Sequence, residues 1–351
     1  MNYVINGIQQ VGIGVSNAEE AWAWYRKHFG MDVPVFKDAA KANLMTKYTG
    51  GIAESRYAIL ALNMKGGGGF EIWQYTSRTP VAGSRNPKLG DLGIIAIKLK
   101  TDNIDKAFNH LRNLKANIVS QIGIQPDGRK HFFVRDPYQN LFQIVESNNW
   151  FQTREFPIGG VCGAIIGISN SEKTLALYQH ALQHKELIYS EKKLFNDLNS
   201  LENGNQIYQR TLIKNNNVFT GPFSKLLGNT ELEFIESNEA NPWQTFENRL
   251  WGDLGYIHLC FDVSGMNELN NSTTKVGHPF TVDSSTSFDM GKAAGHFSYI
   301  EDSDKTLIEF VETHKVPIIE KLGWYLNLKN RKTRKALPNI IVKGLGLKRV
   351  K

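Results

Sequence analysis

The chain has 351 residues, 41% of them hydrophobic, and a formal net charge of +7. This length and composition predict a globular protein large enough for about two domains. No apolar run approaches the roughly 18 residues that span a membrane, and no signal peptide is visible. We therefore expect a cytoplasmic protein without stable membrane insertion.

The positive charge is concentrated at the C-terminus. Residues 315–351 contain 11 basic residues and one acidic residue, whereas the preceding 314 residues contain 30 basic and 33 acidic ones. Because the body is nearly neutral, we expect no nucleic-acid partner. The basic C-terminal extension could contact anionic surfaces, or it could lie over the body through Trp324, Tyr325, Ile340 and Ile341.

The two cysteines, Cys162 and Cys260, are too few for a disulfide framework or a thiolate zinc cluster. Each lies in an apolar run, which predicts a buried free thiol.

The first predicted strand lies within NGIQQVGIGVSN, residues 6–17, where apolar residues alternate with others. Side chains alternate across a strand, so Gln10, Gly12 and Gly14 should share one face. The glycines are expected to leave open space beside the single polar side chain. An amphipathic helix should follow, capped by Ser16 or Asn17 and stopped by Gly30.

A glycine run, Gly66–Gly69, comes next in the segment MKGGGGF. It lacks the lysine and the helix that follow a phosphate-binding loop. It therefore predicts a flexible hairpin end or a mobile lid.

The first strand and helix recur 153 positions later, because VGIGVSNAEEAWAWYRKHFG corresponds to AIIGISNSEKTLALYQHALQ and aligns Tyr25 with Tyr178. A second pair of segments begins with GDLGIIAIKLK at Gly90 and GDLGYIHLCFD at Gly252. The ends match too, as VRDPYQNLFQIVE and IEDSDKTLIEFVE, with an aspartate in the tight turn before the last strand: Asp136 and Asp302.

These repeats divide the chain into four modules, each reading strand, helix, then several strands, near residues 4–78, 90–148, 158–239 and 252–314. The predicted fold class is α+β, with curved sheets backed by outer helices. The expected domains are an N-terminal half, a C-terminal half and the basic C-terminal extension, at residues 1–150, 151–314 and 315–351.

The repeated motifs resemble the vicinal oxygen chelate superfamily, which includes glyoxalase I, extradiol dioxygenases, and the bleomycin and fosfomycin resistance proteins. The resemblance covers residues 4–314 and rests on VGIGVSNAEEAWAWYRKHFG, GYIHLCFDV and SYIEDSDKTLIEFVE. It implies four βαβββ modules that pair to form two half-barrel cavities. In that family, metal ligands come from the first and last strands of paired modules.

Those ligand positions can be read in this sequence. The first strands supply Gln10, Ala96, Gly163 and His258, and the last strands supply Glu71, Gln143, Glu233 and Glu309. Only modules one and four offer a full set, so these two should pair, as should modules two and three. A pairing of modules three and four would instead retain Glu233, His258 and Glu309. The second cavity, from Ala96, Gln143, Gly163 and Glu233, has too few donors and is interpreted as structural or allosteric.

The quartet Gln10, Glu71, His258 and Glu309 resembles the ligand set of eukaryotic-type glyoxalase I. These donors suit a divalent ion such as zinc, nickel, cobalt or manganese. The resemblance makes Glu309 the first candidate for the general base, with Glu71 as its counterpart. The predicted function is a glyoxalase-like metal-dependent lyase or isomerase acting by proton transfer on a small α-oxygenated substrate.

The expected substrate cavity is lined by Gly12, Gly14, Trp73 and Tyr75. Glyoxalase I binds the glutathione carboxylates at positions that here hold Gly14, Tyr75 and Leu254, none of which is a cation or an amide. Glutathione hemithioacetal is therefore not the expected substrate. Trp73 and Tyr75 suggest a flatter or more apolar ligand, although aromatic strand residues are also common core residues.

Two other functions stay open. A drug-sequestering binding protein of the same superfamily would hold a small molecule without turnover and without a metal. An extradiol-type dioxygenase would favour two histidines and one carboxylate, and Gly163 stands where that family has a histidine. Taken singly, His258 also fits a satisfied core histidine, and Gln10 a surface amide.

Overall fold

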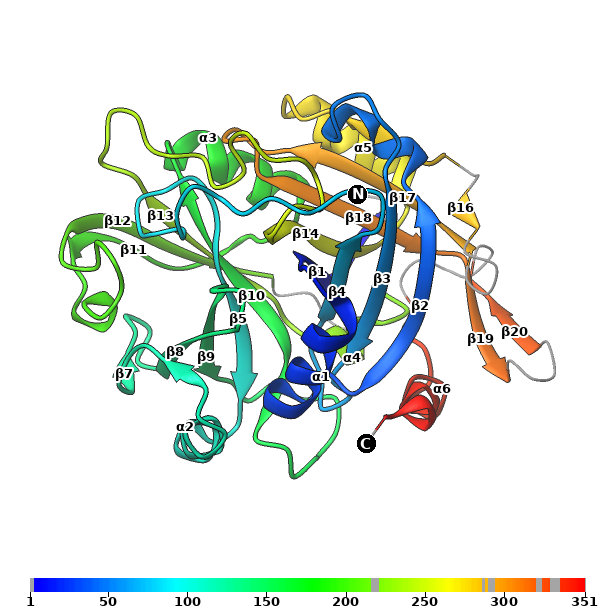
Figure 1. The fold of residues 1–351 in the computed structure, drawn as a ribbon, viewed down its shortest axis with the longest axis horizontal. Coiled ribbons are helices and arrows are strands. Elements are labelled where there is room, and N and C mark those ends of the chain that lie inside the picture. The colour runs from blue at the N-terminus through cyan, green and yellow to red at the C-terminus, as the bar shows by residue number, and fades with distance from the viewer. Residues whose placement is uncertain are drawn as a thin grey trace.

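The computed structural model describes residues 3–215, 221–285, 288–289, 294–319, 324–328 and 335–350. Within these residues the chain forms two curved nine-stranded sheets and a separate two-stranded hairpin, with short helices between strands (Figure 1). The predicted α+β fold class is confirmed.

The strands and helices follow the four repeats in chain order. The first module contains β1 (Val4–Gly14), α1 (Ala18–Phe29), β2 (Val33–Lys41), the 3₁₀ helix η1 (Asn43–Tyr48), β3 (Ser55–Leu62) and β4 (Gly69–Tyr75). The second contains β5 (Gly93–Thr101), α2 (Ile104–Asn113), β6 (Asn117–Ile118), β7 (Gly123–Ile124), β8 (Lys130–Arg135) and β9 (Leu141–Glu146).

The second half of the chain repeats this order. The third module contains β10 (Ile158–Ile168), α3 (Ser171–Ala176), the π-helical turn η2 (Leu177–Ala181), β11 (Glu186–Leu194), η3 (Asn196–Leu198), β12 (Ile207–Lys214), α4 (Ser224–Leu227) and β13 (Glu231–Glu236). The fourth contains β14 (Gly255–Ser264), α5 (Met266–Lys275), β15 (Val282–Asp283), β16 (Phe288–Asp289), β17 (Ala294–Glu301) and β18 (Leu307–Thr313). β19 (Lys315–Ile319), β20 (Trp324–Asn327), α6 (Asn339–Gly344) and η5 (Leu345–Lys348) complete the chain.

Each large sheet combines two modules that are not from the same half of the chain. The outer-module sheet joins modules one and four in the order β15-β17-β18-β14-β1-β4-β3-β2, with β16 at its edge. The inner-module sheet joins modules two and three in the order β11-β12-β13-β10-β5-β9-β8-β6, with β7 at its edge. The modules meet through antiparallel pairs, β1 with β14 and β5 with β10.

The helix ends follow the sequence signals. The side chain of Asn17 accepts a hydrogen bond from the backbone N–H of Glu20, and Gly30 ends α1 in the left-handed conformation with φ 67°. In the third module the side chain of Asn170 accepts from the N–H of Lys173 in the same way. Each cap satisfies a backbone donor that the first helical turn leaves unpaired.

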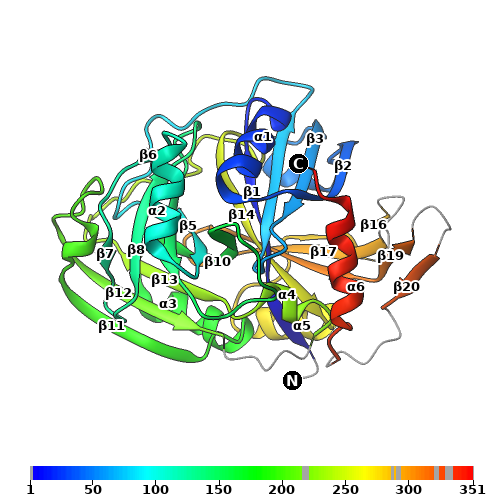
Figure 2. The ribbon, with the colours of Figure 1, turned by 90° about the horizontal axis from the view of Figure 1, so that it is seen from below.

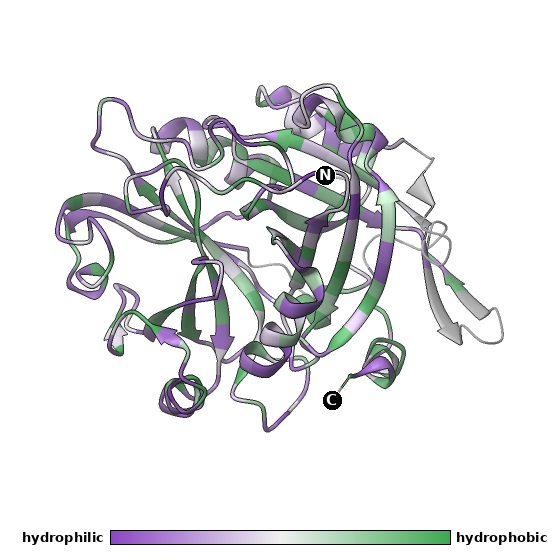
Figure 3. Ribbon diagram, in the orientation of Figure 1, coloured by the Kyte–Doolittle hydropathy of each residue, from purple (hydrophilic) through white to green (hydrophobic). Residues whose placement is uncertain are grey.

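The main apolar core lies between the two sheets. Phe29 of α1 packs against Phe142 of the inner-module sheet at a ring separation of 4.9 Å, and Phe142 lies 5.5 Å from Phe70 of the outer-module sheet. Helix α1 therefore lies between the two sheets, and α2 packs through Phe108 against Phe132, on the same face of the inner-module sheet as Phe142 (Figure 2). Apolar residues dominate the central strands of both sheets (Figure 3). The opposite faces carry the polar donors together with smaller apolar clusters, around Trp73 in the outer-module sheet and Phe133 in the inner-module sheet.

The glycine run Gly66–Gly69 ends the hairpin of β3 and β4, as predicted, but it is buried against β10 and α4, so the prediction of a flexible end or a mobile lid is wrong. The N–H of Gly67 donates to the carbonyl of Leu226 at 2.8 Å, and Gly68 forms a β-bridge with Val161. A Cβ on Gly68 would lie 2.4 Å from the carbonyl oxygen of Ile8. The glycines are there because backbone passes backbone too closely for side chains.

The described part of the C-terminal extension includes α6, which packs through Val342 against a cluster containing Val33, Met64 and Leu226. Ile340 faces solvent and is 80% exposed. The side chains of Trp324 and Tyr325, predicted to hold this extension on the body, lie outside the described part of the chain. None of the described helices has the length and hydrophobicity needed to cross a membrane.

Candidate metal centre

Four neighbouring strands of the outer-module sheet bring the predicted quartet together. Gly12 of β1 is opposite Glu71 of β4 on one side and His258 of β14 on the other. Cys260 of β14 is likewise opposite Gln10 of β1 and Glu309 of β18. Potential ligand atoms of Glu71, His258 and Glu309 all lie within 4.8 Å of one another.

The separations between these donors suit one shared ion. His258 Nε2 lies 3.0 Å from Glu309 Oε2 and 3.5 Å from Glu71 Oε2. Gln10 Nε2 donates to an oxygen of each carboxylate at 3.3 Å. Ligand atoms bound to one ion at about 2.1 Å lie roughly 3.0–3.4 Å apart. The four side chains are therefore close to the arrangement that a divalent ion requires.

Two buried atoms of this group lack a hydrogen-bond partner among the described residues: Gln10 Oε1 and His258 Nε2. The contacts of His258 Nε2 with the carboxylates do not have hydrogen-bond geometry. A half-turn of the Gln10 amide would place its oxygen where the nitrogen now faces the two carboxylates. Acceptor atoms buried without a donor are what a bound cation would satisfy, so the residues present fit a metal ion.

Burial and mutual charge set the proton affinities in this group. Burial, reinforced by the Glu309 carboxylate, raises the pKa of Glu71 to about 7. Burial acts against ionisation of Glu309 too, but the adjacent His258 outweighs it and lowers the pKa of Glu309. For His258 burial favours the neutral ring, yet the carboxylates of Glu309 and Glu71 raise its pKa. The cluster thus has an excess of negative charge to share with a cation.

The space beside Gly12 and Gly14 is filled, so the expectation of open space there is wrong, whereas a role of these glycines in the substrate cavity stays a prediction. A Cβ on Gly12 would lie 2.5 Å from Cε1 of the His258 ring. A Cβ on Gly14 would lie 2.0 Å from the carbonyl oxygen of Asp253. Both glycines allow close approach, and Gly12 lets the imidazole lie directly against β1.

Trp73 and Tyr75 follow Glu71 on the same face of β4, as alternation predicts, but both are buried. The ring of Trp73 lies 4.7 Å from those of Tyr75 and Trp251. Met45 of η1 and Tyr299 of β17 complete this aromatic layer. A contact of Trp73 or Tyr75 with substrate stays a prediction.

Three residues near the donors were missed from the sequence. The hydroxyl of Tyr299 lies 3.4 Å from His258 Nδ1, where it can orient the ring. Only Tyr299 could have been found from the sequence, because it lies in a strand whose side chains alternate between two faces. Met45 and Trp251 lie in connections between strands, where no regular spacing of apolar residues indicates which side chains are buried.

The corresponding position of the inner-module sheet is occupied by the protein's own cations. Glu233 is the last-strand acid there, and its Oε2 lies 2.5 Å from Nζ of Lys98. Arg210 pairs with the other oxygen of Glu233. Ala96, Gln143 and Gly163 hold the remaining positions. Lys98 is buried, and no sequence pattern pointed to it.

The comparisons with known proteins agree with this fold. Residues 7–144 match the model of the Glyoxalase/Bleomycin resistance protein/Dioxygenase superfamily. A search of curated proteins finds no match.

Solved structures provide full-length neighbours. Glyoxalase I from Zea mays aligns with a TM-score of 0.54 at 12% identity, covering 87% of this chain and 92% of that one. A putative dioxygenase from Bacillus subtilis aligns with a TM-score of 0.56 at 15% identity, covering 88% and 85%. At such identities the likeness shows a shared fold.

Proposed function

We propose that this chain is a metal-dependent lyase or isomerase that moves a proton on a small α-oxygenated substrate, and the match of residues 7–144 to the model of the glyoxalase/bleomycin resistance protein/dioxygenase superfamily supports this. The observation that supports this most is the convergence of Gln10, Glu71, His258 and Glu309, with two buried acceptor atoms lacking partners among the described residues. The resemblance noted from the sequence is supported by this family match, and the solved structures share the fold.

In this proposal the quartet holds zinc, nickel, cobalt or manganese, and the bound ion stabilises negative charge on a substrate oxygen. Tyr299 orients His258 through Nδ1. The aromatic layer around Trp73 and Trp251 keeps water away from the donors. A dry site strengthens each electrostatic interaction inside it.

Proton transfer belongs to the two carboxylates. Glu309 is the first candidate for the general base, and Glu71 is its counterpart on the opposite module. Glu71, whose pKa burial raises to about 7, suits a group that exchanges a proton near neutral pH. Such a base typically accelerates a reaction by about 10²- to 10⁴-fold.

The substrate that fits best is small and lacks multiple carboxylates. Gly14, Tyr75 and Leu254 stand where glyoxalase I would need charged or amide partners for glutathione. Tyr75 directs its hydroxyl to the backbone carbonyl of Trp251, so it is already hydrogen-bonded. Each missing charge-assisted contact would cost roughly 1.5–3 kcal/mol of binding.

Metal content is the first test. The full-length protein, purified without chelator, should contain close to one divalent ion per chain by elemental analysis. His258→Ala should lose this ion, whereas His180→Ala, at an exposed position, should keep it. A protein that contains no metal and whose properties do not change when a chelator is added would contradict the proposal and favour the drug-sequestering alternative.

Activity is the second test. Incubation with α-hydroxy ketones in heavy water should exchange the substrate α-proton, as followed by NMR. Glu309→Gln should reduce this exchange by about 10²-fold or more, and Glu71→Gln should reduce it to a similar degree. Unchanged exchange in Glu309→Gln would rule out the assigned base. Consumption of oxygen with a catechol would instead indicate the dioxygenase alternative.

A further inference from the structure

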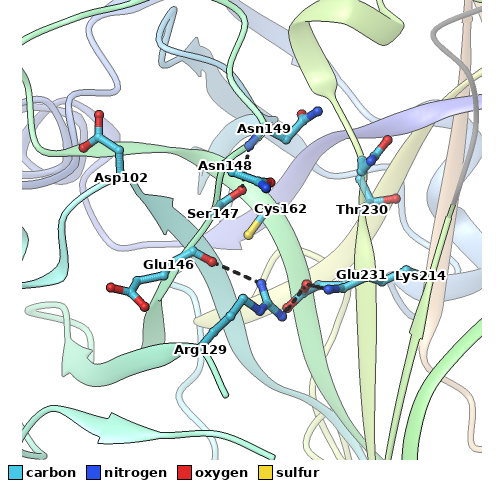
Figure 4. A pocket seen from close by; sticks show the side chains of 11 residues that line it. Asp102, Arg129, Glu146, Ser147, Asn148, Asn149, Cys162, Lys214, Thr230 and Glu231 are labelled. Atoms are coloured by element: carbon cyan, nitrogen blue, oxygen red, sulfur yellow. Dashed lines mark hydrogen bonds and ion pairs between the residues drawn. The ribbon is translucent and has the colours of Figure 1, made fainter. Parts of the chain in front are cut away.

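A cavity of about 460 Å³ lies at one end of the inner-module sheet, outside the candidate metal centre (Figure 4). Its walls include Arg129, Glu146, Cys162, Lys214 and Glu231, together with the loop that follows β9. In Figure 4 the guanidinium of Arg129 faces the carboxylate of Glu231, and the sulfur of Cys162 lies between them and the loop. Nothing in the proposed reaction uses this cavity.

The carboxylates of the lining already have partners. Glu231 receives hydrogen bonds from Arg129 Nη2 at 2.8 and 2.9 Å and from Lys98 Nζ at 3.0 Å. Asp102 lies 2.7 Å from Nζ of Lys65. Glu146 accepts the backbone N–H of Lys130 at 2.9 Å. The negative charges at the wall are therefore compensated or hydrogen-bonded.

One buried positive charge is not compensated. Lys100 of β5 is 1% exposed, and its Nζ donates to the backbone carbonyl of Asn149 at 2.7 Å. No carboxylate oxygen of the described residues lies within 4 Å of it, and the ring of Trp150 is 5.1 Å away. Burial, with a contribution from Lys65, lowers the pKa of Lys100 to about 8. A buried ammonium without a counter-ion is costly.

Two other buried lysines near Lys100 do have acidic partners. Lys98 precedes Lys100 by two residues on the same face of β5 and pairs with Glu231 and Glu233. Lys65, equally buried, pairs with Asp102. Of these three buried lysines only Lys100 lacks an acidic partner among the described residues.

Lys100 lies directly behind the residues that line the cavity and contacts one of them. Asn149, which accepts its hydrogen bond, is part of the lining. On the other side, a Cβ on Gly228 would lie 3.4 Å from Lys100 Nζ, and the two residues after Gly228 also line the cavity. The ammonium is thus located where two lining segments meet.

We propose that this cavity binds a small molecule with an anionic oxygen group, a carboxylate or a phosphate, whose charge is compensated by Lys100. Asn148 and Asn149 supply amide donors at the wall, and Lys214, whose Nζ lies 3.5 Å from a Glu231 oxygen, adds positive charge beside them. Burial raises the pKa of the Cys162 thiol to about 11, so the sulfur stays protonated and does not repel an anion. The proposal is independent of the metal centre.

Thermal unfolding of the full-length protein tests this proposal. Inorganic phosphate or oxalate, added at constant ionic strength, should raise the Tm, and glycerol should not. Lys100→Met should raise the Tm without anion, because it removes an uncompensated buried charge, and should weaken anion binding at least about tenfold by calorimetry. Lys106→Met, at an exposed position of α2, should respond like the wild type.

The possible results show which anion binds and at which site it binds. A response to phosphate alone or to oxalate alone identifies which oxygen group the cavity takes. His258→Ala should keep the anion response, and its loss would place the anion at the metal centre and overturn the proposal. An unchanged response in Lys100→Met, or no response of the wild type at roughly 10 mM anion, would overturn it too. As a measurement on the unaltered protein, the anion should slow the modification of Cys162 by a methanethiosulfonate.

Discussion

Asp262 of β14 is a buried acid without a cationic partner among the described residues. Its side chain is 1% exposed. Asn6 Nδ2 donates to one of its oxygens at 2.5 Å, and Gln9 Nε2 to the other at 3.1 Å. Burial raises the pKa of Asp262 to about 7, although these two hydrogen bonds act in the opposite direction. The carboxyl group is therefore partly protonated in the folded protein near neutral pH.

This pKa predicts a pH-dependent stability. The folded pKa lies above the unfolded value of about 3.9, so the stability from Asp262 is complete below that value and is lost as pH rises through about 7. Asp262→Asn should therefore gain stability relative to the wild type between pH 4 and pH 8, by roughly 2–4 kcal/mol. Urea unfolding across this range measures the change. Asp105→Asn, at an exposed position of α2, should show no such trend. If Asp262→Asn instead lost stability relative to the wild type as the pH rises, the raised pKa of Asp262 would be contradicted.

At the residue scale, the resemblance to the superfamily implied the four candidate ligands, and strand alternation and the internal repeats showed which positions of this sequence correspond to them. The expectation from the sequence failed at Gly12 and Gly14. A glycine in a strand indicates that another group approaches the backbone closely, but not which group. The ring of His258 lies against Gly12, and the backbone of Asp253 lies against Gly14. Lys98 and Lys100 were missed as well, because a lysine in a strand gives no sign of whether it will be buried.

At the scale of elements, two equivalent hydrogen bonds connect consecutive modules. The hydroxyl of Tyr25 on α1 donates to Asp136 Oδ2 at 2.6 Å, in the turn before β9. The hydroxyl of Tyr178 on η2 donates to Asp302 Oδ2 at 3.1 Å, in the turn before β18. All four side chains are buried, so these bonds couple a helix of one module to a turn of the next.

Removing either hydroxyl should destabilise the protein. Tyr25→Phe leaves the buried Asp136 without one donor and should lower the free energy of unfolding by about 1–3 kcal/mol. Tyr178→Phe should have a comparable effect through Asp302. Tyr57→Phe is a matched control, because Tyr57 donates to the exposed Glu19 and should change stability by less than about 0.5 kcal/mol. Chemical denaturation measures all three, and an effect at Tyr25 as small as at Tyr57 would contradict this coupling.

The elements that the sequence predicted well are those with a period or a cap. The strand, cap and helix of the first and third modules follow directly from Asn17 and Asn170. The short helices η1 and η3 were not predicted, since they lie in connections without alternation. Met45 of η1 nevertheless packs into the aromatic layer, and Asp197 of η3 pairs with Arg210. The contact of Tyr25 with Asp136 was not visible either, because repeats align residues without showing which ones touch.

At the scale of the whole molecule, each half of the chain supplies part of both large sheets. Residues 1–150 contribute β1–β4 to the outer-module sheet and β5–β9 to the inner-module sheet. Strand counting from repeats was enough to predict the fold class. The pairing of modules was expected from where the metal donors lie rather than from any backbone signal, which is why the alternative pairing of modules three and four could not be dismissed from sequence.

The two halves should therefore depend on each other. Residues 1–150 expressed alone would leave the edges of β1 and β5 without the partners β14 and β10. We expect this fragment to aggregate or self-associate, and to form a 1:1 complex when produced together with residues 151–351. Size-exclusion chromatography with light scattering distinguishes these states. A folded, monomeric 1–150 fragment would show that the half chain is an autonomous domain.

The contact between Gln10 and Glu309 spans 299 positions of the chain. A ribosome therefore makes Gln10 299 residues before Glu309. Before β14 is made, β1 has no strand on that edge and the nascent chain contains only Gln10 and Glu71 of the four donors. Under the proposed function, an ion would therefore be bound with full affinity only after Glu309 has been made and β18 has joined the sheet, so metal loading would follow folding rather than guide it.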